Sequence, residues 1–122
     1  MSAETTAAQE VDYDGLLFHP TGACPDDDVF TGEYHQVGDL VWAEIAGPPV
    51  RMGRLVGTVA ADGTIDAGYS QVMDDGEVVS GRVLSSPTRL PDGRIRLAEH
   101  WRRSDGSSGV SYIDSEPAAP GS

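Results

Sequence analysis

The fold is decided by residues 89–101, which have the sequence R-L-P-D-G-R-I-R-L-A-E-H-W. The Pro91-Asp92-Gly93 segment predicts a tight turn, and an alternating stretch follows it. One phase of that stretch contains Ile95, Leu97, Glu99 and Trp101, and the other contains Arg94, Arg96, Ala98, His100 and Arg102. Since successive side chains of a strand point to opposite faces, the first set is expected in a core and the second in water.

Glu99 is the exception on the apolar phase, because its carboxyl lies between Leu97 and Trp101. A buried carboxyl must be paired, hydrogen-bonded or neutral. Two roles therefore stay open for Glu99. It is either an acid that contacts a ligand, or a structural group that pairs with a core arginine or caps the end of the domain.

Asp-Gly pairs recur along the chain at residues 62–63, 75–76, 92–93 and 105–106, and between alternating runs such pairs predict hairpins. We expect strands at about Tyr13–Pro20, Val29–Val37, Asp39–Ala46, Val50–Ala60, Thr64–Met73, Glu77–Ser86, Arg94–Arg103 and Ser108–Asp114. No segment shows a helical period. The sequence therefore predicts an all-β protein, an eight-stranded antiparallel up-and-down barrel, with a β-sandwich as the alternative. Such a barrel is either filled by side chains or holds one small ligand.

Length and composition favour one domain at 12–115, with disordered tails at 1–11 and 116–122. The net charge is −12 and there is no lysine, which excludes lysine Schiff-base chemistry and makes nucleic acid and membranes poor partners. The single Cys24 cannot form an internal disulfide. Residues 1–10 do not resemble a signal peptide, so a cytoplasmic location is expected. The Ala, Gly, Asp and Arg richness suggests a GC-rich bacterial gene.

Inward-facing residues can be assigned for some strands only. We expect Ile65, Ala67, Tyr69, Gln71 and Met73 to face inward, together with Val79, Gly81, Val83 and Ser85, with Gly81 leaving open space. Either Tyr34 or His35 enters the barrel, but not both. The Asp39–Ala46 strand is ambiguous because both phases are largely apolar, and its outer phase is a candidate homodimer interface. Arg94, Arg96, Arg102 and Arg103 are expected on the outer face.

Several segments resemble a family of small bacterial barrel proteins, many of which carry the label N-acetylglutamate synthase. The segments are G-E-Y-H-Q-V-G-D-L-V-W-A-E-I from Gly32, G-R-L-V-G-T-V from Gly53, D-G-T-I-D-A-G-Y from Asp62, L-P-D-G-R-I-R-L-A-E-H-W from Leu90 and G-S-S-G-V-S from Gly106. The architecture is similar to calycin and avidin-like barrels, which implies ligand binding by analogy. Because the expected fold lacks a helix N-terminus to bind the coenzyme A pyrophosphate, we do not expect an N-acetyltransferase.

The candidate site is centred on Glu99, with Tyr69 as a second candidate catalytic residue. Candidate ligand-contacting residues are Trp101, Gln71, Tyr34, Trp42 and Leu97. His19, His35 and His100 are dispersed, so no metal site is expected, and no cofactor is expected either. Three functions fit: a barrel that binds a small, largely apolar molecule; a cyclase or isomerase of secondary metabolism that uses Glu99 as its acid and base; or a filled barrel that docks a protein.

Overall fold

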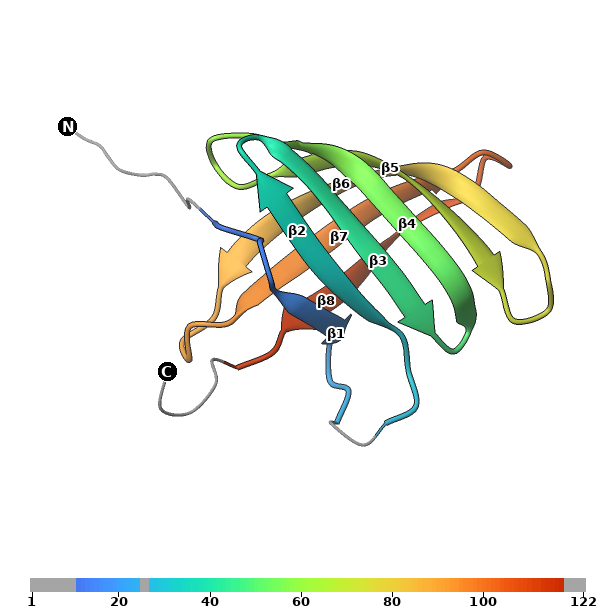
Figure 1. The fold of residues 1–122 in the computed structure, drawn as a ribbon, viewed down its shortest axis with the longest axis horizontal. Coiled ribbons are helices and arrows are strands. Elements are labelled where there is room, and N and C mark those ends of the chain that lie inside the picture. Colours follow the sequence, from blue (N-terminus) through green and yellow to red (C-terminus); the bar gives the residue numbers. More distant parts are fainter. Residues whose placement is uncertain (1–10, 25–26, 118–122) are drawn as a thin grey trace.

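The structure is a computed structural model that describes residues 11–24 and 27–117. Its strands are β1 (Leu17–Pro20), β2 (Thr31–Val37), β3 (Leu40–Gly47), β4 (Val50–Val59), β5 (Ile65–Met73), β6 (Val78–Arg89), β7 (Ile95–Arg103) and β8 (Ser108–Ser115). Each strand pairs antiparallel with the next, and β8 pairs with β1, so the sheet closes into a barrel (Figure 1). The predicted eight-stranded up-and-down barrel is confirmed, and the sandwich alternative is wrong.

The four Asp-Gly turns share one geometry. In each turn the glycine alone has a positive φ, between 89° and 94°. At Asp62-Gly63, the Gly63 amide donates to the Ala60 carbonyl at 2.9 Å and the Ala60 amide donates to the Thr64 carbonyl at 2.8 Å. These are three-residue loops with the glycine in the left-handed conformation, rather than two-residue turns with two such residues. The aspartate accepts a hydrogen bond from the amide two residues later in all four cases.

Strand bounds differ from the prediction by more than two residues at two places. The first strand begins at Leu17 rather than Tyr13, because the Leu16 amide donates to the Tyr13 carbonyl and Gly15 has a φ of 84°. These features turn the chain before β1. At the other place, β6 continues past Ser86 to Arg89, and its last residues pair with the start of β7.

The alternation predicted for β5, β6 and β7 is confirmed. Residues of the expected inner phases are buried, including Ile65, Ala67, Val79, Val83, Ser85, Ile95 and Leu97. In β3 the ambiguity is resolved in favour of Val41, Ala43 and Ile45, which are buried, while Leu40 and Trp42 are exposed. In β2 it is Tyr34 that enters the barrel, and His35 lies on the outer face.

Gly81 does not leave open space above β6, contrary to the prediction. A Cβ atom at this position would lie 2.2 Å from the Arg102 carbonyl oxygen and 2.9 Å from the Arg103 Cα. The neighbouring strand β7 therefore occupies that space with its own backbone. Glycine at this position permits the close approach of two backbones.

The seam between β1 and β8 is short, and polar side chains reinforce it. Three residue pairs join the strands: Phe18 with Ser115, His19 with Asp114, and Pro20 with Ile113. Asp114 is buried and accepts hydrogen bonds from Arg96 Nε at 2.7 Å and from Thr21 Oγ1 at 3.0 Å. The Arg96 guanidinium holds the pKa of the Asp114 carboxyl below its ordinary value. Through these two contacts Asp114 holds the end of β8 beside β7, which carries Arg96, and beside the end of β1, which Thr21 follows.

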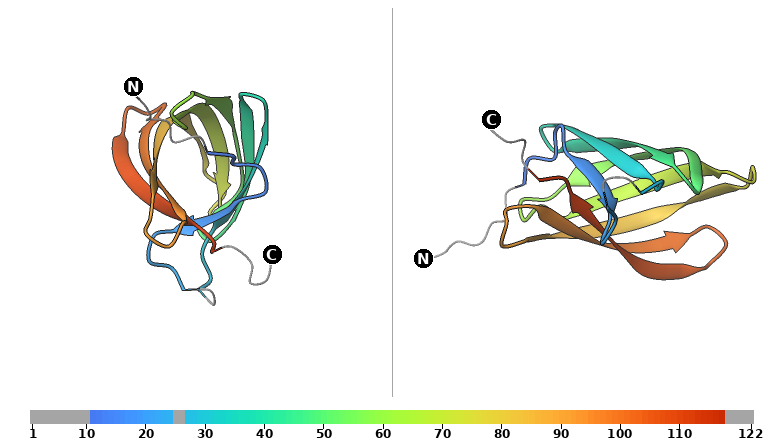
Figure 2. Two further views of the ribbon diagram at one scale, coloured as in Figure 1. Left: turned by 90° about the vertical axis from the view of Figure 1, so that its left-hand side faces the viewer. Right: turned by 90° about the horizontal axis from the view of Figure 1, so that it is seen from below.

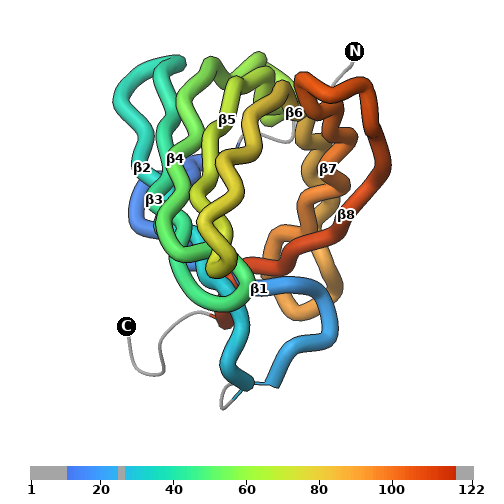
Figure 3. The backbone as a smooth tube through the Cα atoms, turned by 90° about the vertical axis from the view of Figure 1, so that its right-hand side faces the viewer, coloured from blue at the N-terminus to red at the C-terminus, as the bar shows by residue number. Residues whose placement is uncertain are grey.

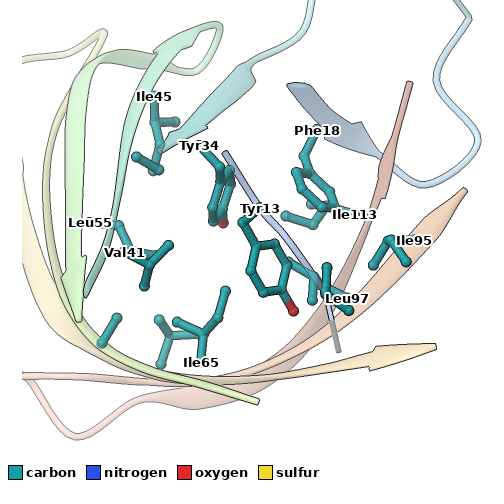
Figure 4. Packing of buried hydrophobic residues seen from close by; sticks show 14 of the residues in the cluster. Tyr13, Phe18, Tyr34, Val41, Ile45, Leu55, Ile65, Ile95, Leu97 and Ile113 are labelled. Carbon is teal, nitrogen blue, oxygen red and sulfur yellow. The ribbon is translucent and has the colours of Figure 1, made fainter. Parts of the chain in front are cut away.

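One end of the barrel is closed by the segment that precedes β1, which runs across part of that end in Figure 2 (left). Tyr13 is fully buried, and its hydroxyl donates to the Gly63 carbonyl at 2.6 Å. Its ring packs with Phe18 and Tyr34, which contact each other at 4.9 Å between centroids (Figure 4). The opposite end is bordered by the β3–β4, β5–β6 and β7–β8 hairpins (Figure 3).

The expected disordered tails fall largely outside the described residues, as do Pro25 and Asp26 of the acidic loop. Val11, which the prediction placed in the first tail, is buried in the core, and the Glu116 amide donates to the Leu17 carbonyl. Cys24 is exposed and unpaired in the described part of the chain. The described ranges contain no helix with the length and hydropathy needed to cross a membrane.

Replacing Tyr13 with phenylalanine should lower the free energy of unfolding by about 1 to 3 kcal/mol, because the change leaves the buried Gly63 carbonyl without its donor. Urea unfolding followed by circular dichroism measures this. Tyr112→Phe is the matched control, since Tyr112 is exposed and should change stability by less than about 0.5 kcal/mol. Equal effects of the two changes would show that the Tyr13 hydroxyl does not hold this end closed.

Candidate functional site in the barrel interior

A cavity of about 230 Å³ lies inside the barrel, towards the end bordered by the three hairpins. Most of its wall is apolar, with side chains from Phe18, Phe30, Ile45, Pro49, Val50, Leu55, Met73, Val83 and Ile113. The polar groups that line it are Tyr34, Tyr69, Gln71, Glu99, Trp101, Arg103 and Ser111. A concave apolar cavity with a few polar groups is the usual form of a small-molecule site.

Glu99 is the acidic residue of the cavity wall. On the barrel wall it lies between Ser85 of β6 and Ser111 of β8, its register partners on the two neighbouring strands. Within the described residues it forms no ion pair and no side-chain hydrogen bond, so the structural ion pair considered from the sequence is not present there. Burial raises the pKa of Glu99 to about 7. At neutral pH the carboxyl is therefore present in both protonation states.

Two further buried hydroxyl groups belong to the surroundings of Glu99. Burial raises the pKa of the Tyr34 hydroxyl well above its ordinary value, and the nearby charge of Glu99 raises it further. Ser85 is fully buried, and its hydroxyl has no hydrogen-bond partner among the described residues. The carboxyl of Glu99, in the cavity wall, and the unpaired hydroxyl of Ser85 thus occupy paired positions on β7 and β6.

Trp101 lies across the inner surface of β8. Its indole Nε1 donates to Ser111 Oγ at 3.0 Å, and a Cβ atom on Gly109 would lie 2.5 Å from its ring. The absence of a side chain at position 109 therefore allows the indole to lie flat against the neighbouring strand. The Arg103 guanidinium lies over the same indole, with Cζ 5.1 Å from the ring centroid, a cation–π contact.

Arg103 was expected on the outer face, and the structure places it in the cavity wall. The reason is the strand period, because Arg103 continues the inner phase of Glu99 and Trp101 by one step. The alternation of the strand therefore indicates an inward position for Arg103 from the sequence alone. Ser111 was also missed, although it shares a phase with the buried Ile113. Phe30 and Pro49 line the cavity from loops, where no periodicity indicates direction.

Five of the seven predicted site residues line the cavity: Glu99, Trp101, Tyr69, Gln71 and Tyr34. Leu97 is fully buried in the core but is not part of the cavity wall. Trp42 lies on the outer face of β3, 37% exposed, and stacks on His35 at 5.4 Å between centroids. Its position outside the barrel follows from the inward phase of Val41 and Ala43, so it cannot contact a ligand in the interior. Any role of the five cavity residues in catalysis or binding stays a prediction.

One group among the described residues could hold a metal ion, and it lies on the outside of the barrel. Glu33, His35 and Glu44 have potential ligand atoms within 4.8 Å of one another. His35 Nε2 is 3.9 Å from a Glu33 oxygen and 4.0 Å from a Glu44 oxygen. Because Glu33 and Glu44 are directly opposite in the β2–β3 register, the histidine between them also offsets their repulsion when protonated. The expectation of no metal site is left untested by this arrangement.

The fold and the cavity together define a class of protein, the closed eight-stranded barrels with room inside for one small ligand. The family model described as avidin-like protein matches residues 11–115, and the chain therefore belongs to the avidin-like family. The predicted avidin-like architecture is confirmed, and family membership is consistent with small-molecule binding. Comparisons with curated proteins and with solved structures gave no match.

The raised pKa of Glu99 predicts how stability depends on pH. Because the pKa is about 7 in the folded protein and 4.5 ordinarily, protonation favours the folded state. This stabilisation is complete below pH 4.5 and is lost as the pH rises through 7. Glu99→Gln removes it, so the variant should be about 3 kcal/mol more stable than the wild type at about pH 8 and about equal to it at pH 4. Urea unfolding at both pH values measures the difference, and a variant less stable at pH 8 would show that Glu99 is paired.

Proposed function

We propose that this protein binds a small, largely apolar molecule in the barrel interior, oriented by Glu99. The observation that carries the proposal is an unpaired carboxyl in the wall of an apolar cavity. Glu99 is half-buried and has no hydrogen-bond partner among the described side chains, so a ligand in the cavity would supply one in place of solvent. The cavity of about 230 Å³ is larger than the 150 Å³ or so that holds benzene, so the ligand is somewhat larger than one aromatic ring.

The polar groups of the cavity support an oriented ligand rather than a freely rotating one. Glu99 lies on β7, whereas Tyr69 and Gln71 lie on β5, on the other side of β6. A protonated carboxyl can donate a hydrogen bond to a carbonyl or hydroxyl oxygen, and an amide side chain can both donate and accept. Apolar contact would supply most of the binding energy, while these groups would select which way the molecule lies.

Native mass spectrometry of the freshly purified protein tests this proposal. The wild type should carry a retained small molecule, and Leu55→Trp should not, because the larger side chain projects into the cavity. Val56→Trp is the matched control, since the next residue on β4 is 65% exposed and should retain the molecule.

Circular dichroism checks that both variants fold, because overpacking costs about 1 to 3 kcal/mol. Loss of the bound molecule from both folded variants, or its retention by folded Leu55→Trp, would contradict binding in this cavity. If the wild type retains nothing from the cell, uncharged aromatic probes added in calorimetry should bind to it and not to Leu55→Trp. Failure of all of them to bind would overturn the proposal.

A second function, a cofactor-free cyclase or isomerase, is favoured by the pKa of Glu99 near 7. General acid–base catalysis is most efficient when the pKa of the catalytic group is near the working pH. A cavity that holds the substrate in a folded conformation would bring the reacting atoms together. Glu99 would then give a proton to the substrate and take one back, with Tyr69 as a further candidate for proton transfer or positioning.

Comparison of the molecules retained by wild type and by Glu99→Gln distinguishes the two functions. A binding protein should retain the same molecule in both forms. An enzyme should retain substrate in the variant, which keeps the shape of the site without a transferable proton. Because the substrate and product of an isomerase or cyclase share one mass, the extracted molecules must be compared by chromatography and NMR. Identical molecules that the wild type leaves unchanged would exclude the enzyme.

The homodimer stays a prediction. Its candidate interface is the outer face of β2, β3 and β4, where Val37, Leu40, Trp42 and Val56 are exposed and neighbouring in register. Sedimentation equilibrium measures the oligomeric state directly, and a monomer at micromolar concentration would contradict the homodimer.

A further inference from the structure

Arg103 is the basic residue of the cavity wall. It lies at the end of β7, near the end of the barrel that the β3–β4, β5–β6 and β7–β8 hairpins border, which we call the open end. Its Nε is buried and has no hydrogen-bond partner among the described residues. A buried donor without a partner is costly, and a charged one more so. The stacking contact with Trp101 fixes the guanidinium in place without satisfying its donors.

No acidic side chain of the described residues neutralises this guanidinium by an ion pair. The arginines that form salt bridges are Arg82 with Asp66, Arg94 with Asp92, and Arg96 with Asp114. Asp105, in the β7–β8 turn, is near enough to interact with the charge of Arg103. Its pKa, however, is lowered chiefly by hydrogen bonds from Ser107, and Arg103 has a smaller effect. Both Ser107 hydrogen bonds go to Asp105 Oδ1, and among the described residues no hydrogen bond or ion pair within 4.0 Å joins Asp105 to Arg103.

Among the described residues, Glu99 and Arg103 form no ion pair with each other. They are four residues apart on one face of a strand, so their Cα atoms are separated by about 13 Å. Trp101 occupies the position between them. The cavity wall therefore presents a carboxyl at its inner part, an indole surface in the middle and a guanidinium at the open end.

We propose that the molecule held in the cavity is a small amphipathic acid whose carboxylate binds Arg103 and whose planar apolar body lies against Trp101. This inference rests on the proposed function and adds the charge and direction of the ligand. A guanidinium binds carboxylate with two parallel hydrogen bonds, which gives both affinity and orientation. Because Nε is buried, the two terminal Nη groups of Arg103 would donate these bonds. The opposite end of the ligand would then reach the carboxyl of Glu99.

The charges around the open end make the Arg103 contact necessary for such a ligand. The β5–β6 turn carries Asp74, Asp75 and Glu77, all exposed, and the protein has a net charge of −12. An anion is therefore repelled at long range, although salt screens exposed charges beyond about 8 to 10 Å. A direct contact with a partly buried guanidinium is screened much less.

Isothermal titration calorimetry with a matched pair of probes tests this proposal. Naphthoate and its uncharged amide, naphthamide, have nearly the same shape and differ in charge. The wild type should bind naphthoate at least about tenfold more tightly than naphthamide, because a hydrogen bond to a charged group is stronger than a neutral one. Arg103→Gln should abolish this preference by weakening naphthoate binding more than naphthamide binding. Arg102→Gln is the matched control, since the neighbouring Arg102 is exposed on the outer face and should not alter the preference.

Each outcome separates the two proposals. Binding of both probes with equal affinity by the wild type would overturn the acid ligand and leave the binding cavity intact. Binding of neither probe would count against a cavity that accepts apolar molecules of this size, and so against the proposed function as well. A preference that survives in Arg103→Gln, or that disappears in Arg102→Gln, would show that Arg103 does not hold the carboxylate.

An NMR measurement on the wild type covers the case in which Arg103→Gln fails to fold. The side-chain Nε–H resonance of Arg103 should shift on addition of naphthoate and not of naphthamide. Absence of that shift at saturating naphthoate would overturn the proposal.

Discussion

The structure depends on the closure of the sheet between β8 and the short strand β1. An open eight-stranded sheet would expose two edges of unpaired amides and carbonyls, and only closure removes both. Here closure relies on three residue pairs. The polar contacts of Asp114 with Arg96 and Thr21 therefore contribute more to the stability of the closed sheet than a surface ion pair would. The cavity exists because this seam holds, since most of the residues that line it lie on strands of the closed sheet.

Closure also explains why the two ends of the barrel differ. The chain enters the barrel at one end, and the segment before β1 places Tyr13 there, against Phe18 and Tyr34. At the opposite end, three hairpins of the described chain border the cavity without filling it. A packed core at one end and a cavity at the other thus follow from the path of the chain.

The recurring Asp-Gly turns and the eight alternating runs were sufficient to predict the fold, and the alternation of β5, β6 and β7 predicted much of the inner face, including Glu99, Tyr69 and Gln71. It failed where the physical signal was ambiguous or absent. In β3 both phases are apolar, so periodicity could not show that Val41 rather than Trp42 faces inward. The inward position of Tyr13 depends on a turn at Gly15 and on a partner, Gly63, fifty residues away, which no local pattern contains. In Arg103 the two signals disagree, because its phase is that of Glu99 and Trp101 while its charge is typical of an outer face.

The positions of the two tryptophans give the molecule a pair of built-in optical reporters. Trp101 forms part of the inner wall beside Glu99, while Trp42 lies on the outer face against His35. Fluorescence of one indole therefore responds to what enters the barrel, and that of the other to what covers its outside. Single-tryptophan versions of the chain would allow occupancy and self-association to be followed independently in the same solution, without any attached dye.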